Sequence, residues 1–373
     1  MFEQQIQEVI LLMVYASVTV ISLIACCYLL FRRANAIAPD ITSPVRLRRW
    51  TAAFFASLAL GHLWYLPTYF LSSDDDVKLC NLIGGLLDAM TAFPLAIVIL
   101  FCMLQDRKRP LWPIALMVAP LVAGMAWGVF IHSDTLMPIL RIYFLLMGIG
   151  LLIYMVHATR QYGRWLRDNF ADLEHKEVWQ SFVVLVLIFV LSNFYVGGVE
   201  LPVYEYVLQI SGGVLICYLL WRVETLSELS LSQQESLSTD LSIADTYDHS
   251  TLGALSAKNI EALLQQHCID TQLYLQHDLT IIQLAKAVGT NRFYLSQYFT
   301  SLGINYNAYI NDLRINHFIS LHQEAVATNR VFTVQQLAQE SGYHSYSTFC
   351  SVIKRKTGKS VTAWIKVAVP PKL

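Results

Sequence analysis

A series of long apolar runs in the first 223 residues constrains the fold of this chain more than any other feature. A helix needs about 20 mostly apolar residues to cross the roughly 30 Å hydrocarbon core of a bilayer. Seven runs approach or exceed that length, at residues 9–31, 52–71, 82–104, 112–131, 139–157, 181–198 and 206–221. We therefore predict that residues 1–223 form a bundle of seven transmembrane helices.

Lysine and arginine gather in alternate loops between these runs. They are Arg32, Arg33, Arg46, Arg48 and Arg49 after the first run, Arg107, Lys108 and Arg109 after the third, Arg160, Arg164 and Arg167 after the fifth, and Arg222 after the seventh. Cytoplasmic loops carry such an excess of positive charge. We predict an outside N-terminus and a cytoplasmic C-terminus in a bacterial inner (cytoplasmic) membrane. No basic residue precedes the first run, so we expect that span to be kept rather than cleaved.

The composition changes after the last run. The whole chain is 55% hydrophobic and 14% charged with a net charge of -1, but these values average an apolar half and a half of ordinary soluble composition. Residues 224–256, between the halves, are rich in serine and acidic residues and contain no lysine or arginine. We predict a linker there, either a flexible tether or a short dimerising coil through Leu226, Leu229 and Leu237. Homodimer formation stays open at this stage.

Three ionisable residues lie within the predicted spans: His62, Asp88 and Arg141. Charge in hydrocarbon is costly, so such residues usually face a partner or a wet cavity. One interpretation is a ligand pocket that senses a small-molecule or membrane signal. The other is a lock, in which Asp88 pairs with Arg141 or His62 and holds the helices together.

Residues 333–358 have the pattern of a helix-turn-helix. A short helix around Leu337 is followed by Gly342, where a positive φ costs little. Ser345 can then cap a second helix with one apolar face and a basic end. The apolar face is formed by Phe349, Val352 and Ile353, and the basic end by Lys354, Arg355 and Lys356. In this motif the second helix enters the major groove of DNA.

A second copy of the pattern lies upstream in the chain. Thr280, Gln283, Leu284, Ala285 and Gly289 align with Thr333, Gln336, Leu337, Ala338 and Gly342 at a constant offset of 53 residues. Leu295 and Phe299 then match Phe349 and Ile353, with one residue inserted in the later copy. We therefore predict a domain at residues 257–373 with two helix-turn-helix motifs, at about 280–301 and 333–357.

A linking helix is predicted between the two copies. Residues 306–322 place Tyr309, Leu313, His317 or Phe318, and Leu321 on one helical face. A helix of about 20 residues spans about 30 Å. This length is close to the roughly 34 Å between successive major grooves on one side of a duplex.

The C-terminal residues resemble the AraC/XylS-type transcription regulators over about residues 260–366. The resemblance rests on both Leu-Ala-x-x-x-Gly turns, on Tyr309-x-x-x-Leu313-Arg314, and on the Phe349-x-x-x-Ile353-Lys354 run that leads to Gly358. Val361 stands where the family usually has proline, and Ile365 where an arginine is common. The resemblance implies an all-α DNA-binding domain whose partner is double-stranded DNA.

Helical geometry assigns roles in the two second helices. If Leu295 faces inward, the DNA side carries Phe293, Ser296 and Gln297 in the first copy and Ser347, Cys350 and Ser351 in the second. Gln297 can pair with adenine, and Phe293 can touch a thymine methyl group. Phosphate contacts, which position the helix without reading sequence, are predicted for Arg292, Lys354 and Arg355.

No enzyme signature is found, and no catalytic residues are predicted. The chain has no Walker A, HExxH or GxSxG sequence, and no glycine-rich ATP-binding boxes of a histidine kinase follow the linker. Its seven cysteines lack zinc-ligand spacing with histidines, so free thiols are expected, without a metal or cofactor. The leading hypothesis is a membrane-bound transcription regulator that senses a signal through its transmembrane bundle. The alternative is a membrane receptor or transporter whose C-terminal helical domain docks protein partners.

Overall fold

The structure, a computed structural model, describes residues 2–32, 34–39, 41–133, 135–196, 202–229 and 253–368. Within these ranges the regular structure is helical, which confirms the all-α prediction, and one isolated antiparallel bridge joins Phe170 and Thr280. The chain divides into two compact units. Unit 1 contains Met1–Tyr162 and Val178–Leu229, and unit 2 contains Gly163–Glu177 and Ser230–Leu373. A short stretch from the middle of the apolar half thus belongs to the C-terminal unit, which linear domain boundaries do not anticipate.

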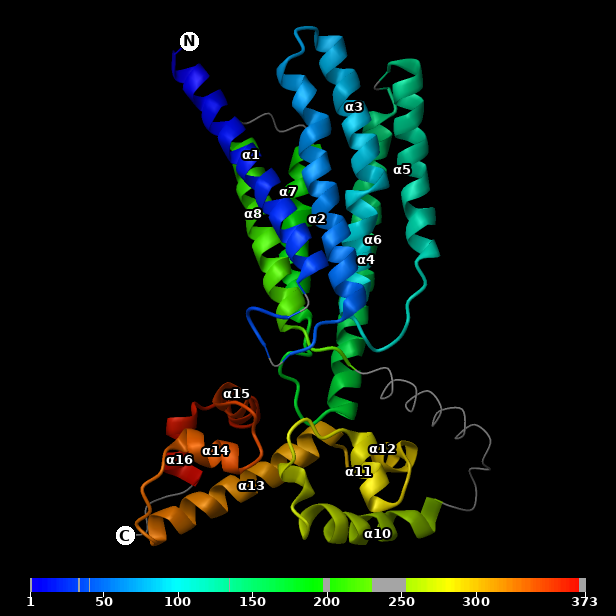
Figure 1. Ribbon diagram of the computed structural model, residues 1–373. Helices are drawn as coiled ribbons and strands as arrows, with labels where there is room; N and C mark the ends of the chain where they lie inside the picture. The colour runs from blue at the N-terminus through cyan, green and yellow to red at the C-terminus, as the bar shows by residue number, and fades with distance from the viewer. Residues whose placement is uncertain are drawn as a thin grey trace. The chain divides into compact units, whose positions relative to one another are not determined.

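Unit 1 is a helical bundle (Figure 1). Its helices are α1 (Phe2–Phe31), α2 (Val45–Tyr65), α3 (Asp74–Met90), α4 (Ala92–Met103), α5 (Trp112–Ile131), α6 (Met137–Asn169), α7 (Trp179–Val196) and α8 (Pro202–Thr225), of which α6 continues from Gly163 into unit 2. Helix α1 packs against α2 and α8, and α3 packs against α5. Within the described residues each predicted apolar run lies largely on helix, and the third run is divided at Thr91, where the backbone leaves helical geometry between α3 and α4.

Five stretches of the described chain are long and apolar enough to cross a membrane. They are Val9–Phe31, Asp74–Met103, Trp112–Ile131, Met137–Asn169 and Tyr206–Thr225. The predicted spans in α2 and α7 are not among them. In α2, Arg46, Arg48 and Arg49 occupy the first turns and make that helix less apolar. The number of seven spans is not confirmed and stays a prediction.

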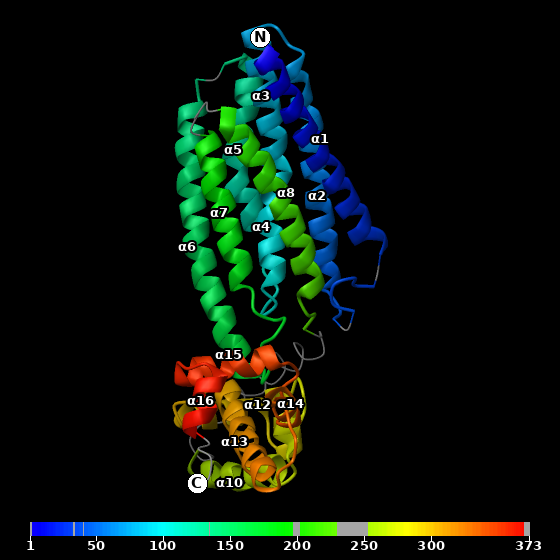
Figure 2. The ribbon, with the colours of Figure 1, turned by 90° about the vertical axis from the view of Figure 1, so that its left-hand side faces the viewer.

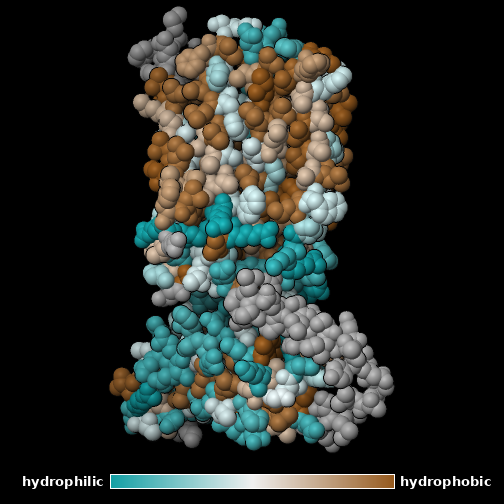
Figure 3. All heavy atoms as spheres, turned by 45° about the vertical axis from the view of Figure 1, so that its right-hand side comes forward, coloured by the Kyte–Doolittle hydropathy of each residue, from teal (hydrophilic) through white to brown (hydrophobic). Residues whose placement is uncertain are grey.

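Large apolar side chains are exposed along unit 1. Phe31, Phe130 and Ile153 are 81%, 82% and 68% exposed, and apolar residues cover much of the helical surface on the face seen in Figure 3. In unit 2 the exposed large apolar side chains of the described chain are Leu302, Ile304, Val326 and Val331. Soluble monomers rarely expose apolar patches beyond a few hundred Å², so the surface of unit 1 suggests association with a membrane.

Glu224, in the last turn of α8, fastens the loop that follows α1. Its buried carboxylate accepts hydrogen bonds from the backbone N–H groups of Ala36 and Ile37, at 3.0 and 3.1 Å. Tyr28 also donates to it at 2.5 Å, and Arg48 lies 3.9 Å away. A buried carboxylate needs such donors to offset its lost hydration, so this group fixes one end of α8 against α1 and its loop.

The chain leaves the helical conformation directly after α8. Leu226 and Leu229 are buried within unit 1, at 0% and 7% exposure, in a non-helical stretch held by Gln105. The predicted continuation of the helix as a dimerising coil is therefore wrong as far as Leu229, because these side chains pack inside their own unit. Leu237 and most of the predicted linker at 224–256 lie outside the described residues.

Unit 2 is built around one long helix. Its helices are α10 (Gly253–Leu264), α11 (Ile281–Val288), α12 (Arg292–Ser301), α13 (Tyr306–Ala327), α14 (Val334–Glu340), α15 (Tyr346–Thr357) and α16 (Val361–Ala368). Figure 1 shows α13 with α10–α12 toward one end and α14–α16 toward the other, and Figure 2 shows the same helices turned by 90°. The helix starts are fixed by side-chain caps, which satisfy otherwise unpaired N–H groups. The capping residues are Thr280, Asn291, Asn305, Thr333 and Ser345.

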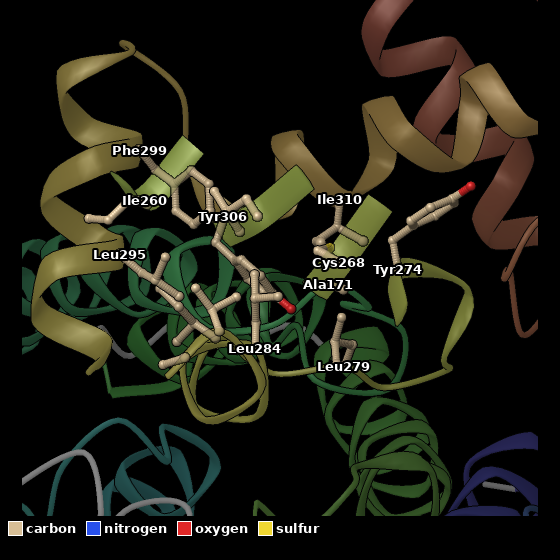
Figure 4. Close-up of a cluster of buried hydrophobic side chains, with 14 residues drawn as sticks. Ala171, Ile260, Cys268, Tyr274, Leu279, Leu284, Leu295, Phe299, Tyr306 and Ile310 are labelled. Carbon is tan, nitrogen blue, oxygen red and sulfur yellow. The ribbon is translucent and has the colours of Figure 1, made fainter. Parts of the chain in front are cut away.

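Helix α13 forms part of two separate hydrophobic cores. Its first half contributes Tyr306 and Ile310 to a cluster with Leu284, Leu295 and Phe299, and Ala171 belongs to the same cluster (Figure 4). Its second half contributes Ile315 and Phe318 to another cluster, whose other buried members are Leu337, Ala338, Tyr343, Phe349, Val352, Ile353, Val361 and Trp364. Each fully buried aliphatic or aromatic side chain contributes roughly 1.5–3 kcal/mol, so α13 joins two halves that each have a core of their own.

The face predicted from apolar spacing in the linking helix is not its most deeply buried face. Tyr309 and Leu313 are only partly buried, whereas Tyr306, Ile310, Arg314 and Phe318 are at most 1% exposed. A guanidinium such as that of Arg314 is costly to bury without partners. The tertiary structure supplies its partners, and the buried face is turned accordingly.

Candidate nucleic-acid interface

Helices α11 and α12 form the first helix-turn-helix. Thr280 and Gln283 make a capping box, in which each side chain accepts a hydrogen bond from the other residue's backbone N–H. Helix α11 ends at Gly289, whose φ of 75° is in the left-handed region. Leu295 and Phe299 of α12 are 0% and 2% exposed. The inward register predicted from Leu295 is confirmed.

Helices α14 and α15 repeat this arrangement. Gly342, with a φ of 88°, forms the turn, and the Ser345 side chain accepts a hydrogen bond from the backbone N–H of Thr348 at 3.2 Å. A Cβ at position 342 would lie 2.8 Å from Leu275 Cα, so both the backbone angle and the space require glycine. Phe349 and Ile353 are fully buried. The predicted cap, turn and apolar face of the second copy are confirmed.

Helix α13 joins the two helix-turn-helix motifs, and its length sets the distance between their second helices, α12 and α15. Helix α13 contains 22 residues, which corresponds to about 33 Å at 1.5 Å per residue. Successive major grooves on one side of a duplex are roughly 34 Å apart. The length of α13 thus fits a spacer between two helices that enter adjacent grooves.

Most of the predicted DNA-contact residues lie on the surface of unit 2. Gln297, Ser347, Ser351, Lys354 and Arg355 are exposed, and Arg292, Phe293 and Ser296 are half-buried. Cys350 instead packs against the second core at its edge, because it directly follows the buried Phe349 on α15. This packing argues against the predicted contact of Cys350 with the major groove of DNA.

The three basic residues at the end of α15 differ in their surroundings. Arg355 donates a hydrogen bond to Asn307 Oδ1 at 3.0 Å, and Lys356 pairs with Asp312, so both are tied to α13. Lys354 is exposed and has no ion-pair partner in the described part of the chain. Of the three, Lys354 is the cation most available to a phosphate.

Residues 169–176, which we call the docking segment, run along unit 2. The backbone N–H of Ala171 donates to Leu279 O at 3.0 Å, and Asn307 donates to the carbonyl of Phe170 at 3.3 Å. Phe170, Ala171 and Asp172 are 3%, 2% and 4% exposed. Further along, Lys176 pairs with Asp278 at 2.7 Å, and this cation holds the pKa of Asp278 below its usual range despite partial burial, which acts the other way.

Arg314 is the central polar residue of unit 2. It is 0% exposed, and its guanidinium binds both oxygens of Asp172, at 2.7 and 3.3 Å. It also donates to the carbonyls of Tyr274 and Gln276, each at 2.8 Å, and lies over the Tyr343 ring. Arg314 therefore joins the docking segment to both halves of the unit.

Glu174 caps the start of α15 from outside the helix. Its carboxylate accepts hydrogen bonds from the hydroxyls of Ser345 at 2.7 Å and Ser347 at 3.3 Å, and from that of Thr348. Burial alone would raise the pKa of Glu174, but the hydrogen bonds from Thr348 and Ser345 outweigh it and hold that pKa below the usual value. Glu174 is accordingly an anion at neutral pH.

The sequence patterns did not mark Asp172, Glu174 and Arg314 as candidate functional residues. A usable signal was the occurrence of acidic residues in a loop otherwise predicted, from Arg160, Arg164 and Arg167, to be basic. Their partners are more than 140 positions away in the chain, at separations of 142 for Asp172–Arg314 and 171 for Glu174–Ser345. Neither hydropathy nor helical periodicity can pair residues over such distances.

The candidate sensor residues of unit 1 have different partners from those expected. Asp88 Oδ2 accepts a hydrogen bond from the Tyr65 hydroxyl at 3.0 Å, and His62 Nε2 lies 2.9 Å from Gln209 Oε1. Arg141 is exposed, and the described residues contain no ion pair between Asp88 and Arg141. The polar contacts thus link α2 to α3 and α2 to α8, and the Asp88–Arg141 lock is not formed.

Comparison with known proteins gives one family. Residues 284–366 match the helix-turn-helix domain family of the AraC type, from within α11 to near the end of α16. The match supports an AraC-type, DNA-binding transcription regulator. Searches of curated proteins and of solved structures found no significant match.

Proposed function

We propose that this protein is a membrane-bound transcription regulator, which binds promoter DNA through α12 and α15 and senses a signal through the helices of unit 1. The observation that carries the proposal is the pairing of two features in one chain. Two capped helix-turn-helix motifs stand within unit 2, largely inside the region that matches the helix-turn-helix family. The described part of the same chain contains five helical stretches long and apolar enough to cross a membrane.

The two second helices supply the DNA-reading groups. Gln297 on α12 and Ser351 on α15 are exposed on the sides opposite Leu295 and Phe349, where base edges would lie. Lys354 and Arg292 would hold phosphates. With α13 about 33 Å long, each helix would enter its own major groove on one face of the duplex.

The membrane part would place unit 2 in the cytoplasm. Loops rich in lysine and arginine alternate with loops that carry little positive charge, in the order that predicts an outside N-terminus. The C-terminal unit would then be in the cytoplasm, where it can reach chromosomal DNA. The polar pairs Tyr65–Asp88 and His62–Gln209 lie between helices of unit 1. Polar groups inside a membrane bundle are costly, so a signal that rearranged these pairs could shift the packing of α2 against α3 and α8.

The full-length protein in lipid nanodiscs, mixed with a pool of randomised double-stranded DNA, tests this function. We expect enrichment of a two-part sequence whose half-sites are about one helical turn apart, with affinity that falls as salt rises. A control with Lys354→Ala and Arg292→Ala together should bind every sequence more weakly. A protein-docking domain would enrich no sequence, and that result would replace the proposal with the receptor or transporter hypothesis.

A further inference from the structure

The docking segment contacts the DNA-facing ends of both second helices. Glu174 accepts hydrogen bonds from Ser345, Ser347 and Thr348 at the start of α15, and Asn169 accepts one from Arg292 Nε, at 2.8 Å, at the start of α12. In helix-turn-helix proteins the first residues of the second helix lie against base edges and neighbouring phosphates. A segment from elsewhere in the chain therefore occupies groups that DNA would use.

Glu174 presents the chemistry of a DNA phosphate to α15. A phosphate is an anion whose oxygens accept hydrogen bonds from hydroxyls and N–H groups at a helix N-terminus, where the helix dipole favours negative charge. The Glu174 carboxylate has the same charge sign and takes three hydroxyl donors of that N-terminus. A phosphate and Glu174 cannot both be bound there, because they compete for the same donors and repel each other.

We propose that the docking segment is an autoinhibitory element, in which Glu174 covers the N-terminus of α15 and must withdraw before that helix can bind DNA. This inference rests on the proposed function, since it has meaning only if unit 2 binds DNA. The occupant of the surface is the chain's own acidic loop, seated on it in the structure.

The segment has a firm part and a releasable part. Phe170 O accepts a hydrogen bond from the Asn307 side chain, the Ala171 N–H donates to Leu279 O, and Asp172 forms the buried pair with Arg314. The Glu174 side chain is 28% exposed and is held by surface hydroxyls. Glu174 can therefore leave α15 while the anchor at Asp172 stays in place, which keeps unit 2 folded during release.

Chain continuity connects the segment to the apolar helices. It begins at the last residue of α6 and ends shortly before α7 starts at Trp179. The backbone that carries Glu174 is therefore continuous with both helices. The Ser-rich linker before α10 is therefore not the only covalent route from the membrane helices to unit 2.

The test compares four full-length proteins in nanodiscs: wild type, Glu174→Ala, Glu174→Gln and Glu177→Gln. The last variant removes the same charge from the same loop, at an exposed position just beyond the docking segment, and serves as the control. A labelled duplex is selected from a randomised pool with the Glu174→Ala protein, and its Kd is measured at one fixed salt concentration. Limited proteolysis of unit 2 identifies any variant that has lost its fold. If Glu174→Ala is unfolded, the affinity of Glu174→Gln, which keeps the side-chain shape, is compared with wild type instead.

We expect Glu174→Ala to bind the duplex about tenfold more tightly than wild type, the change produced by removing roughly 1.4 kcal/mol of competition. Glu174→Gln should gain part of this, because it keeps an acceptor and loses the charge, and Glu177→Gln should match wild type. If folded Glu174 variants bind no more tightly than a wild type that does bind, autoinhibition is overturned and the proposed function stands. If none of the four proteins enriches any sequence, both fail. Equal gains from Glu174→Gln and Glu177→Gln would show a general charge effect and also overturn the inference.

Discussion

Arg314 and Asp172, 142 positions apart in the chain, form a bidentate ion pair in which the side chains are 0% and 5% exposed. The pair joins α13 to a stretch that follows α6. Because this stretch lies before the predicted linker, a fragment that begins after the linker would lack Asp172 and leave Arg314 buried without its anion. DNA-binding experiments are for this reason better done with the whole chain.

Removing one member of this pair should destabilise unit 2. Breaking a buried ion pair from one side costs about 3–5 kcal/mol, because an uncompensated charge stays buried. We expect Asp172→Asn and Arg314→Met each to increase the protease sensitivity of unit 2 in full-length protein, read from a C-terminal tag. The double variant Asp172→Asn with Arg314→Met should cost less than the sum of the two single changes. Strict additivity would show that the two residues act independently.

The two turn glycines should differ sharply in their tolerance of alanine. Both have positive φ, 75° at Gly289 and 88° at Gly342, so each alanine has a left-handed backbone cost of about 1–2 kcal/mol. At position 342 the new Cβ would also lie 2.8 Å from Leu275 Cα and 3.1 Å from Arg314 Nε, whereas nothing lies within 4 Å at position 289. Gly342→Ala should therefore lower the proteolytic stability of unit 2 well beyond Gly289→Ala. Similar losses at both positions would contradict the packing around Gly342.

Substitution of Lys354 and substitution of Gln297 should impair DNA binding in different ways. Loss of one phosphate contact weakens binding to all sequences and lowers the slope of log K against log salt by about 1. Loss of a bidentate glutamine contact costs about 1–3 kcal/mol at its preferred base pair and relaxes selection there. We expect Lys354→Ala to show the first behaviour and Gln297→Ala the second, in titrations of full-length protein against a randomised library at two salt concentrations. Identical losses on every sequence would mean that α12 contacts only the backbone of DNA.

Substitutions at Asp88 and at Arg141 should differ in their effect on the thermal stability of the protein. Tyr65→Phe removes a hydrogen bond to a half-buried carboxylate, which contributes about 1.5–3 kcal/mol. We expect Tyr65→Phe and Asp88→Asn to lower the thermal unfolding midpoint of the full-length protein and to change transcriptional output. Arg141→Met, at an exposed position, serves as the comparison for stability. If Tyr65→Phe and Asp88→Asn both left the unfolding midpoint and the transcriptional output unchanged, Asp88 would no longer be a candidate sensor residue.

The predicted topology can be checked with reporters that are active only in the cytoplasm. Fusions after Arg49, Lys108, Arg164 and Arg222 should be active, because these residues belong to the positively charged stretches that are predicted to be cytoplasmic. A fusion after Asp75 should be silent. Activity at Asp75 would show that the chain does not cross the membrane in the predicted order, and would bear directly on whether α2 is a span.

The sequence by itself determined those features that depend on short-range pattern. Long apolar runs gave helices in unit 1, and the 53-residue offset gave two helix-turn-helix motifs whose buried residues Leu295, Phe299, Phe349 and Ile353 are where the period of an α-helix puts them. The turns at Gly289 and Gly342 and the cap at Ser345 follow from the local chemistry of glycine and serine. All of these are set by residues within about one or two helical turns of each other.

Only the tertiary structure decided which distant polar groups meet. Arg314 is buried because Asp172 and two carbonyls compensate its charge, so the most deeply buried face of α13 includes a residue that apolar periodicity does not mark. Glu174 reaches the start of α15 from a loop 171 positions earlier in the chain. Burial of a charge depends on its partners in space, and sequence spacing carries no information about partners so far apart.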